Sequence, residues 1–217
     1  MPNAPRRLPT EERRKQLLDL GLKLFSTRSY EDIEISEIAT LAGVSKGLLY
    51  HYFGSKKDFY AAVVELAAGQ LTDAIEAPQG VPGLARARAG IEAYLSYVDE
   101  RDQAFLALMH GGLGADPKVL AVTERTREAI ADKVMAGIGI SEPSPIYRVA
   151  ARSWLGAVEA ASLDWLRHRD LDREQLVELA LVSLATHIGV ARTSDPQPGT
   201  QPDPELVDMV MRLVMPT

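Results

Sequence analysis

The sequence predicts an all-α protein, and three observations support this fold class. Apolar residues recur at the three- and four-residue steps of a helix along most of the chain. Proline and glycine interrupt these stretches at a few places, near residues 78–83, 116–117 and 143–145. No run of alternating β-branched residues lies between hairpin dipeptides, so we expect no sheet.

The composition narrows the class of protein further. With 46% apolar and 25% charged residues, the 217-residue chain has the balance of a globular protein of one large or two small domains. It has no cysteine, which excludes disulfides and thiolate sites and fits a reducing cytoplasm. Its apolar runs are shorter than the roughly 20 residues that cross a bilayer, and its N-terminus lacks the apolar segment of a secretory signal. We therefore expect a cytoplasmic protein with no membrane partner.

The first third of the chain should form four helices. Thr10 followed by Glu11 and Glu12 suits the start of the first, because a hydroxyl caps a helix and acidic residues favour its first turn. Ser55, with Asp58 three residues later, has the spacing of a capping box and should begin the fourth. The predicted ranges are residues 11–25, about 36–41, about 45–52 and about 56–75.

Five further helical stretches follow, separated by the proline and glycine breaks. They are predicted at residues 83–100, 102–112, 117–138, 145–168 and 172–192. Residues 194–204 are rich in proline and should form a linker before a short amphipathic helix at 206–215.

The second and third helices have the layout of a helix-turn-helix motif. They flank Ala42-Gly43-Val44, and glycine tolerates the left-handed backbone that ends one helix sharply before the next. Ser45 is placed to cap the second helix of the pair, which in such motifs enters the major groove of DNA. Charge is consistent with this reading: residues 1–60 carry ten Lys/Arg and eight Asp/Glu, a balance of +2, whereas the whole chain has a net charge of −6.

Residues from about 10 to 65 resemble the DNA-binding domain of the TetR (tetracycline repressor) family. The positions that carry the resemblance are Ile38-Ala39, Ala42-Gly43-Val44-Ser45, Lys46-Gly47, Leu49-Tyr50, Tyr52-Phe53, Ser55-Lys56 and Phe59, with Leu24-Phe25 upstream. The resemblance implies three parts: an N-terminal arm and three-helix DNA-binding domain at 1–55, an effector-binding and dimerisation domain at 56–193, and a linker with a C-terminal helix at 194–217.

The predicted DNA contacts lie on and around the third helix. Lys46 suits a guanine or a phosphate, Gly47 permits close backbone approach, and Leu48 offers an apolar surface to a thymine methyl group. The family often has Thr or Ser where this chain has Glu34, and we expect Ser36 to take over that cap or phosphate contact. The full predicted set is Ser36, Ser45, Lys46, Gly47, Leu48, Tyr50, His51, Tyr52 and Lys56. Alternatively, the tyrosines are half-buried packing residues and Lys56 belongs to a solvated face.

The last two long helices carry stripes that predict dimerisation. Trp154, Val158, Ala161 and Trp165 recur at steps of four, three and four, and small residues nearby permit close helix approach. Two such helices can pair with their copies as a four-helix bundle across a two-fold axis, as the resemblance also implies. The predicted interface residues are Ala161, Trp165, Leu176, Ala180 and Leu184. The alternative is that both helices are internal core helices.

Helices between residues 83 and 138 should enclose an effector pocket, because ligand pockets are mostly apolar with a few orienting polar groups. The predicted lining is Tyr94, Tyr97, Phe105, Met109, His110 and Met135, with Trp154 from a later helix. The alternative for each of these residues is ordinary core packing.

The predicted function is therefore a ligand-responsive, dimeric transcriptional repressor whose partners are double-stranded operator DNA, a small apolar or amphipathic effector and a second copy of the chain. We expect no enzyme, cofactor or metal, because the histidines His51, His110, His168 and His187 form no ligand or catalytic motif. Asp164 and His168 lie four residues apart, a spacing typical of a surface ion pair. The alternative is an all-α protein that binds or transforms a small molecule and does not bind DNA.

Overall fold

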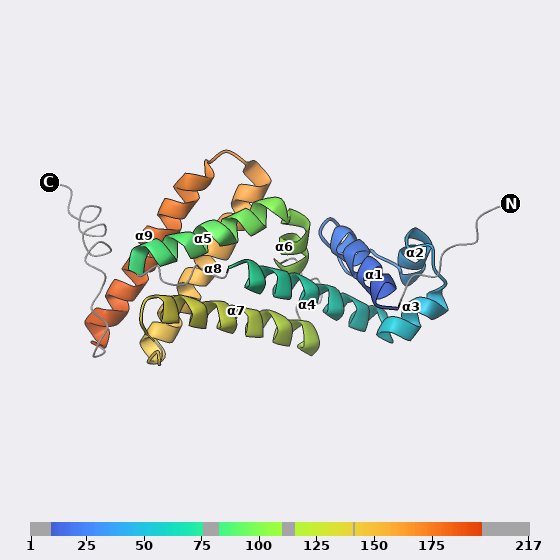
Figure 1. The fold of residues 1–217 in the computed structure, drawn as a ribbon, viewed down its shortest axis with the longest axis horizontal. Helices are drawn as coiled ribbons and strands as arrows, with labels where there is room; N and C mark the ends of the chain where they lie inside the picture. The colour runs from blue at the N-terminus through green and yellow to red at the C-terminus, as the bar shows by residue number, and fades with distance from the viewer. Residues whose placement is uncertain (1–9, 76–82, 110–115, 141, 197–217) are drawn as a thin grey trace. The chain divides into compact units, whose positions relative to one another are not determined.

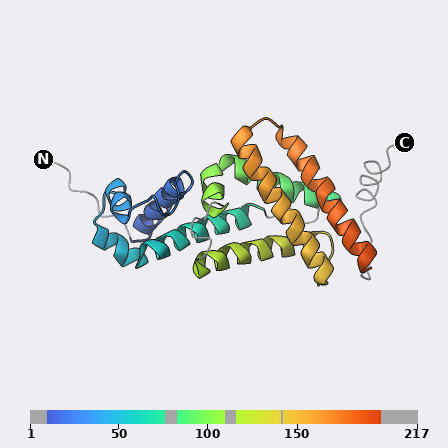
Figure 2. The same cartoon turned by 180° about the vertical axis from the view of Figure 1, so that it is seen from behind.

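The computed structural model describes residues 10–75, 83–109, 116–140 and 142–196, and these residues form helices with no strand (Figures 1 and 2). The all-α prediction is confirmed over this part of the chain. The helices are α1 (Thr10–Phe25), α2 (Ile35–Leu41), α3 (Lys46–Phe53), α4 (Lys56–Ala74), α5 (Gly83–Glu100), α6 (Asp102–Met109), α7 (Pro117–Gly137), α8 (Pro145–His168) and α9 (Arg173–Ser194). The predicted helix at 206–215 lies outside the described residues.

The chain divides into two compact units, whose boundaries fall within α4, between α5 and α6, and within α7. The first contains residues up to Gln70 together with Asp102–Thr123, and the second contains Leu71–Arg101 together with the chain from Glu124 onward. Helix α6 therefore belongs with the N-terminal helices and packs against α1. The predicted division into functional parts, with boundaries after residues 55 and 193, is not the same as these two packing units and stays a prediction.

An aromatic cluster forms the core of the first unit. The ring centroid of Phe25 on α1 lies 4.6 Å from that of Tyr60 and 6.0 Å from that of Phe59, both on α4. Phe53, the last residue of α3, meets Phe59 edge to face at 4.9 Å. Such tilted and edge-to-face pairs are the favoured arrangements of aromatic rings. The cluster therefore joins α1, α3 and α4.

Gly21 permits the close approach of α1 and α4 in the first unit. A Cβ atom at residue 21 would lie only 2.4 Å from Cγ2 of Val63 and 2.8 Å from Cζ of Phe59. Both of these side chains are fully buried, so an added methyl group would force a buried side chain or a helix to shift. Glycine is thus required at this position by packing and not by backbone conformation.

Helices α8 and α9 form the antiparallel pair around which the second unit is built, and both views show them side by side (Figures 1 and 2). The indole Nε1 of Trp154 on α8 donates a buried hydrogen bond to the carbonyl of Ala180 on α9, at 2.8 Å. Trp165 donates in the same way to the carbonyl of Leu171 in the connection, also at 2.8 Å. By length and composition alone, α9 could also cross a membrane. Its buried face packs against α8, as expected of a core helix.

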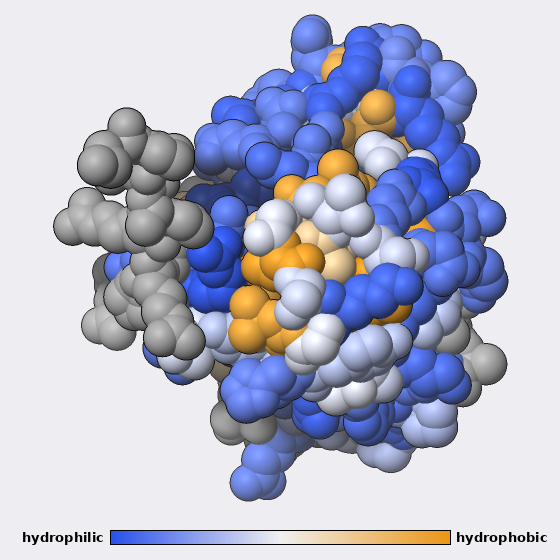
Figure 3. All heavy atoms as spheres, turned by 90° about the vertical axis from the view of Figure 1, so that its right-hand side faces the viewer, coloured by the Kyte–Doolittle hydropathy of each residue, from blue (hydrophilic) through white to orange (hydrophobic). Residues whose placement is uncertain are grey.

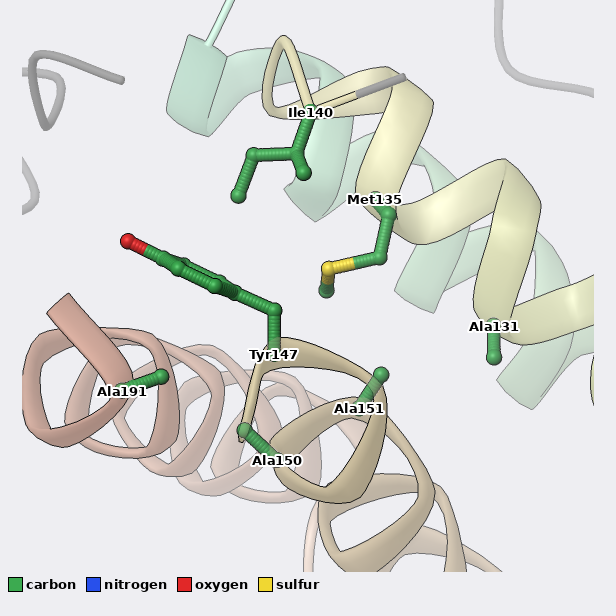
Figure 4. Close-up of a cluster of buried hydrophobic side chains, with 7 residues drawn as sticks. All are labelled: Ala131, Met135, Ile140, Tyr147, Ala150, Ala151 and Ala191. Atoms are coloured by element: carbon green, nitrogen blue, oxygen red, sulfur yellow. The ribbon is translucent and has the colours of Figure 1, made fainter. Parts of the chain in front are cut away.

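Helices α5 and α7 are fixed to this pair by ion pairs and by an apolar cluster. Arg88 on α5 binds Glu174 and Glu178 on α9, and Arg127 on α7 binds Glu159 on α8 at 3.0 Å. Figure 4 shows the apolar cluster, in which the Tyr147 side chain lies among residues of α7 and the turn after it and residues of α8 and α9. The labelled members are Ala131, Met135, Ile140, Tyr147, Ala150, Ala151 and Ala191.

We predict that Gly21→Ala destabilises the protein although alanine is the better helix former. The added methyl group would overpack the contact between α1 and α4, at a cost of about 1–3 kcal/mol in the free energy of unfolding. Gly69→Ala on α4 is the matched control, because a Cβ atom there meets nothing within 4 Å. It should raise the free energy of unfolding by up to about 1 kcal/mol. Urea unfolding of both variants measures the difference, and equal effects would contradict the packing account.

Candidate nucleic-acid interface

Helix α3 is held with one face inward by its own apolar residues and by the turn before it. Leu49 is fully buried and Phe53 nearly so. Gly43 adopts a positive φ of 64°, in the region that glycine enters without strain. The Ser45 hydroxyl accepts a hydrogen bond from the backbone N–H of Leu48 at 3.1 Å, which confirms the predicted cap. Because Leu49 and Phe53 fix the inner face, the residues between them are forced outward.

The outer face of α3 presents most of the residues that the sequence analysis singled out. Lys46, Gly47 and His51 are exposed, and Tyr50 is 45% exposed. Leu48 and Tyr52 are half-buried, and the His51 and Tyr52 rings meet edge to face at 5.8 Å. The face therefore combines one cation with hydroxyl, imidazole and apolar groups, which suits contacts to both phosphates and base edges.

Helix α4 starts beside this face with a group of charged residues. As predicted, Ser55 caps the helix: its hydroxyl accepts from the Asp58 N–H at 3.1 Å and donates to the Asp58 carboxylate at 2.6 Å. Lys118 also binds that carboxylate, and Lys57 lies 3.7 Å from Asp116. The hydrogen bonds from Lys118 and from Ser55 hold the pKa of Asp58 below its ordinary value.

Lys56 differs from its neighbours in this group. Its ammonium lies 4.2 Å from the ring centroid of Tyr30, a cation–π contact that leaves its charge uncompensated. Among the residues that the structure describes, Lys56 has no carboxylate partner. It is half-buried, so the stem of the side chain is held while the charge stays close to the surface.

The start of α2 corrects one expectation. Glu34 is the N-cap residue and its side chain makes no cap hydrogen bond, while Ser36 is the second residue of the helix and is half-buried. Ser36 therefore does not cap α2, because the helix starts one residue earlier than the sequence suggested. The phosphate contact of Ser36 stays a prediction.

Leu41 is a surface residue that the sequence analysis did not single out. It ends α2 and is 56% exposed. Figure 3 shows one face of the molecule, on which apolar and weakly polar residues gather near the centre with hydrophilic residues around them. The signal was present in the sequence: Ile35, Ile38 and Ala39 share the inward phase of the helix, and Leu41 falls outside it. Leu41 is thus an exposed apolar side chain at the end of the helix that precedes α3.

A cavity of about 340 Å³ lies within the second unit, between α5, α7 and α8. Of the residues predicted for an effector pocket, Tyr94 and Trp154 line this cavity. Tyr97 and Met135 are buried outside its lining, and burial raises the pKa of Tyr97 to about 12. Phe105 and Met109 do not line it, because they lie on α6 in the first unit, where α6 packs against α1. His110 lies outside the described residues.

Most of the residues that line the cavity were not predicted from the sequence, and Arg86, Gly90 and Lys133 are among them. Arg86, Gly90 and Tyr94 follow one another at steps of four, so they share one stripe of α5. That periodicity was available in the sequence, but a stripe of arginine and glycine resembles a solvated face and not a pocket wall.

The predicted interface residues of α8 and α9 are already covered within one chain. Trp165, Leu176, Ala180 and Leu184 are all at most 6% exposed and Ala161 is half-buried, because this stripe joins α8 to α9. The alternative of internal core packing therefore describes these five residues. Different residues of the same helices face outward: Val149, Ser153, Gly156, Ala157 and Ala160 on α8, and Leu179, Thr186 and Val190 on α9.

The residues weighed for catalysis show no constellation in the part of the chain that the structure describes. Asp164 and His168 form an exposed pair at 3.4 Å on α8. No group of three histidine, aspartate or glutamate side chains in that part could hold a metal ion.

Comparison with known proteins supplies a family. Residues 17–63 match the model described as "Bacterial regulatory proteins, tetR family", and residues 85–188 match "Tetracyclin repressor-like, C-terminal domain". The chain is 31% identical to the HTH-type transcriptional activator FasR of Mycolicibacterium smegmatis over 179 residues, which are 79% of this chain and 81% of that protein.

Solved structures agree with this match. A tetR-family transcriptional regulator from Streptomyces coelicolor has a TM-score of 0.75 and 31% identity, covering 95% of this chain and 90% of that one. The regulator FadR from Bacillus subtilis, solved in complex with stearoyl-CoA, has a TM-score of 0.63 and 16% identity, covering 80% of this chain and 97% of that one. The second likeness concerns the fold alone.

Proposed function

This chain belongs to the TetR family of bacterial transcriptional regulators, and on that premise we propose that it is a homodimeric repressor that a small apolar or amphipathic effector releases from operator DNA. The observation that carries the proposal is the one-sided burial of α3. Its apolar residues Leu49 and Phe53 are inside, while Lys46 and Tyr50 face solvent. Burial of these side chains would have excluded DNA contacts by α3, and both are exposed.

The contacts to DNA divide by chemistry. We assign Lys46 and Leu48 to the base edges of the major groove, with Gly47 allowing the backbone to come close. Phosphate contacts suit Ser36, Ser45, Tyr50, His51, Tyr52 and Lys56, because hydroxyl, imidazole and ammonium groups donate to phosphate oxygens. The Ser45 hydroxyl accepts a hydrogen bond in the cap and keeps its own hydrogen for a phosphate.

The dimer is proposed to form through the outward faces of α8 and α9. On α8 these are small residues, including Gly156 and Ala160, which let a partner helix approach closely. On α9, Leu179 and Val190 are 57% and 59% exposed. The solvent-exposed apolar surface of these two helices would be covered by the same helices of a second chain, and the bundle then contains four helices.

The cavity of the second unit is the proposed effector site. Its volume of about 340 Å³ is at the small end of the range for ligand pockets, about 300–1,000 Å³. Most of its lining is apolar, with Trp154 and Leu155 on one side and Ile91 on another. We place the regulator in the cytoplasm, where bacterial DNA is found, with no membrane partner.

Lys46 and Lys56 make separable predictions for DNA binding. Lys56→Ala should weaken binding to every DNA sequence alike and reduce the salt slope by about 0.9, the share of one phosphate. Lys46→Ala should cost about 1–3 kcal/mol at particular base pairs and flatten the preference there. Fluorescence titrations at several salt concentrations, with selected and random DNA, measure both effects. Arg167→Ala, which removes an exposed cation of α8, is the control. An equal loss on selected and random DNA would remove Lys46 from base readout.

Adjacent residues of α9 test the dimer face. Leu179→Glu places a charge on the exposed stripe, so the dimer should dissociate into folded monomers. Ala180→Glu buries an unpaired charge against α8 and should unfold the chain, because such a charge is costly to bury. Sedimentation velocity and circular dichroism separate the two results. A Leu179→Glu protein that stays dimeric would contradict this face, since the variant changes no buried contact of the single chain.

Effector and operator DNA should each lower the affinity of the protein for the other by the same factor. If the effector lowers DNA affinity tenfold, which corresponds to about 1.4 kcal/mol of coupling, saturating DNA must lower effector affinity tenfold. The measurement is a titration of an effector, found by a thermal-shift screen of amphipathic metabolites, with and without DNA. Equal effector affinity in both titrations would remove the allosteric part of the proposal.

The repressor part of the proposal is tested by deleting the gene. Expression of a reporter placed behind the operator should then rise, and a fall in expression would assign activation.

A further inference from the structure

The charged side chains that line the cavity have one sign. Arg86 on α5 and Lys133 on α7 both line it, and the residues of its described lining include no carboxylate. The whole chain is acidic, with a net charge of −6, so a cavity with two cations and no acid departs from the average of the protein. An apolar pocket with a few charged groups orients its ligand through those groups.

Arg86 lacks the compensation that its neighbour has. Arg88, two residues along α5, lies close to the carboxylates of Glu92, Glu174 and Glu178. Arg86 has no carboxylate partner among the residues that the structure describes, and its Nε lies 3.7 Å from the position of a Cβ atom at Gly137. A guanidinium stays charged at any physiological pH and binds planar oxyanions in two-point contacts.

Lys133 brings a second positive charge to the same lining, in a different setting. Its ammonium donates a hydrogen bond to the carbonyl of Thr72 in the last turn of α4, at 2.8 Å. An ammonium at the C-terminal turn of a helix stabilises that turn. An anion in the cavity would also attract the Lys133 ammonium, so both the ligand and the last turn of α4 would interact with this one group.

We propose that the cavity takes an amphiphile with a single anionic head, a carboxylate on an apolar body, which Arg86 binds and Lys133 assists. This inference rests on the proposed effector site and adds the sign of the ligand's charge. The apolar body would lie against Ile91, Trp154 and Leu155. A cationic ligand would meet the like charge of Arg86 at reduced dielectric, and a neutral one would leave the Arg86 charge without a partner.

The competing explanation is that Arg86 only supports the end of α7. Gly137 is the last residue of that helix, and a cation near a helix C-terminus interacts favourably with its carbonyl groups. The two roles separate by measurement. A purely structural Arg86 would affect the midpoint of thermal unfolding and treat all ligands alike, whereas a binding Arg86 discriminates ligands by charge.

The experiment uses three ten-carbon probes at pH 7.5, below their aggregation limits: decanoate, decanol and decylamine. At this pH the first is an anion, the second is neutral and the third is a cation. Isothermal titration calorimetry on the full-length protein should give decanoate an affinity at least tenfold above that of decanol, with no binding of decylamine. Arg86→Gln should weaken the affinity for decanoate roughly ten- to hundredfold, which is the contribution of a charge-assisted hydrogen bond, and should leave the affinity for decanol within twofold of the wild-type value.

Three further variants complete the test. Arg86→Lys keeps the charge and should restore most of the decanoate affinity. Arg101→Gln removes an exposed cation just after α5 that lies outside the cavity and should change nothing. Gly90→Leu fills the cavity from a position where a Cβ atom meets nothing within 4 Å, so it should weaken both decanoate and decanol.

Several results would overturn the inference: decanol binding as tightly as decanoate, decanoate failing to bind, Arg86→Gln weakening both probes equally, or decanoate binding unaffected by Gly90→Leu. Failure of the proposed function is distinguished in the same preparations. Each ligand-free variant is titrated with a DNA fragment that the wild-type protein selects from a random pool. If DNA binding is retained together with any of these results, the inference of an anionic ligand is wrong and the proposed regulatory function still stands. Absence of DNA binding by the wild-type protein overturns the regulator itself.

Discussion

The contact between Phe53 and the aromatic cluster of α1 and α4 is the constraint on which the candidate interface depends. Helix α3 has eight residues, too few to be stable alone in water, so its structure must come from tertiary packing. Phe53 and Leu49 supply that packing from one face of the helix. The cluster itself exists because Gly21 lets α1 approach α4 closely enough for Phe25 to reach Phe59 and Tyr60. The positions of Lys46 and Tyr50 on the surface are therefore consequences of packing on the opposite side of the same helix.

The cationic side chains of this acidic protein fall into two groups, those paired with a carboxylate and those without such a partner among the described residues. Several are neutralised within the fold: Arg28, Arg88, Arg127, Arg152 and Arg169 each lie within hydrogen-bond distance of a carboxylate and connect neighbouring segments. Exposed pairs of this kind contribute little stability each, so their main effect is to fix geometry. Others have no carboxylate partner among the described residues, and three of these lie where a ligand would be met. Lys46 and Lys56 lie at the candidate interface, and Arg86 lies in the cavity.

Much of this architecture was predictable, and the misses share a physical cause. The helices follow from the apolar period, and the turn at Gly43 and the caps at Ser45 and Ser55 follow from local backbone chemistry. Periodicity shows which residues share a stripe, but it does not show what the stripe packs against. The Trp154–Trp165 stripe was therefore assigned to a partner chain although it joins α8 to α9. Phe105 was assigned to a pocket for the same reason, and Arg86 was overlooked because a charge on α5 gives no apolar signal.

The pairing of Lys57 and Lys118 with carboxylates at the start of α4 bears on how a regulator of this kind searches a genome. Sequence-independent affinity for DNA grows with the number of phosphates that a protein neutralises, and a cation held by Asp116 or Asp58 is less free to join that count. A chromosome offers on the order of 10⁶–10⁹ competing non-specific sites. Each cation that is paired in this way would lower the affinity of the protein for this background. In the proposed complex, recognition would then depend more on the base contacts assigned to α3, and scanning along the duplex would contribute less to arrival at the site.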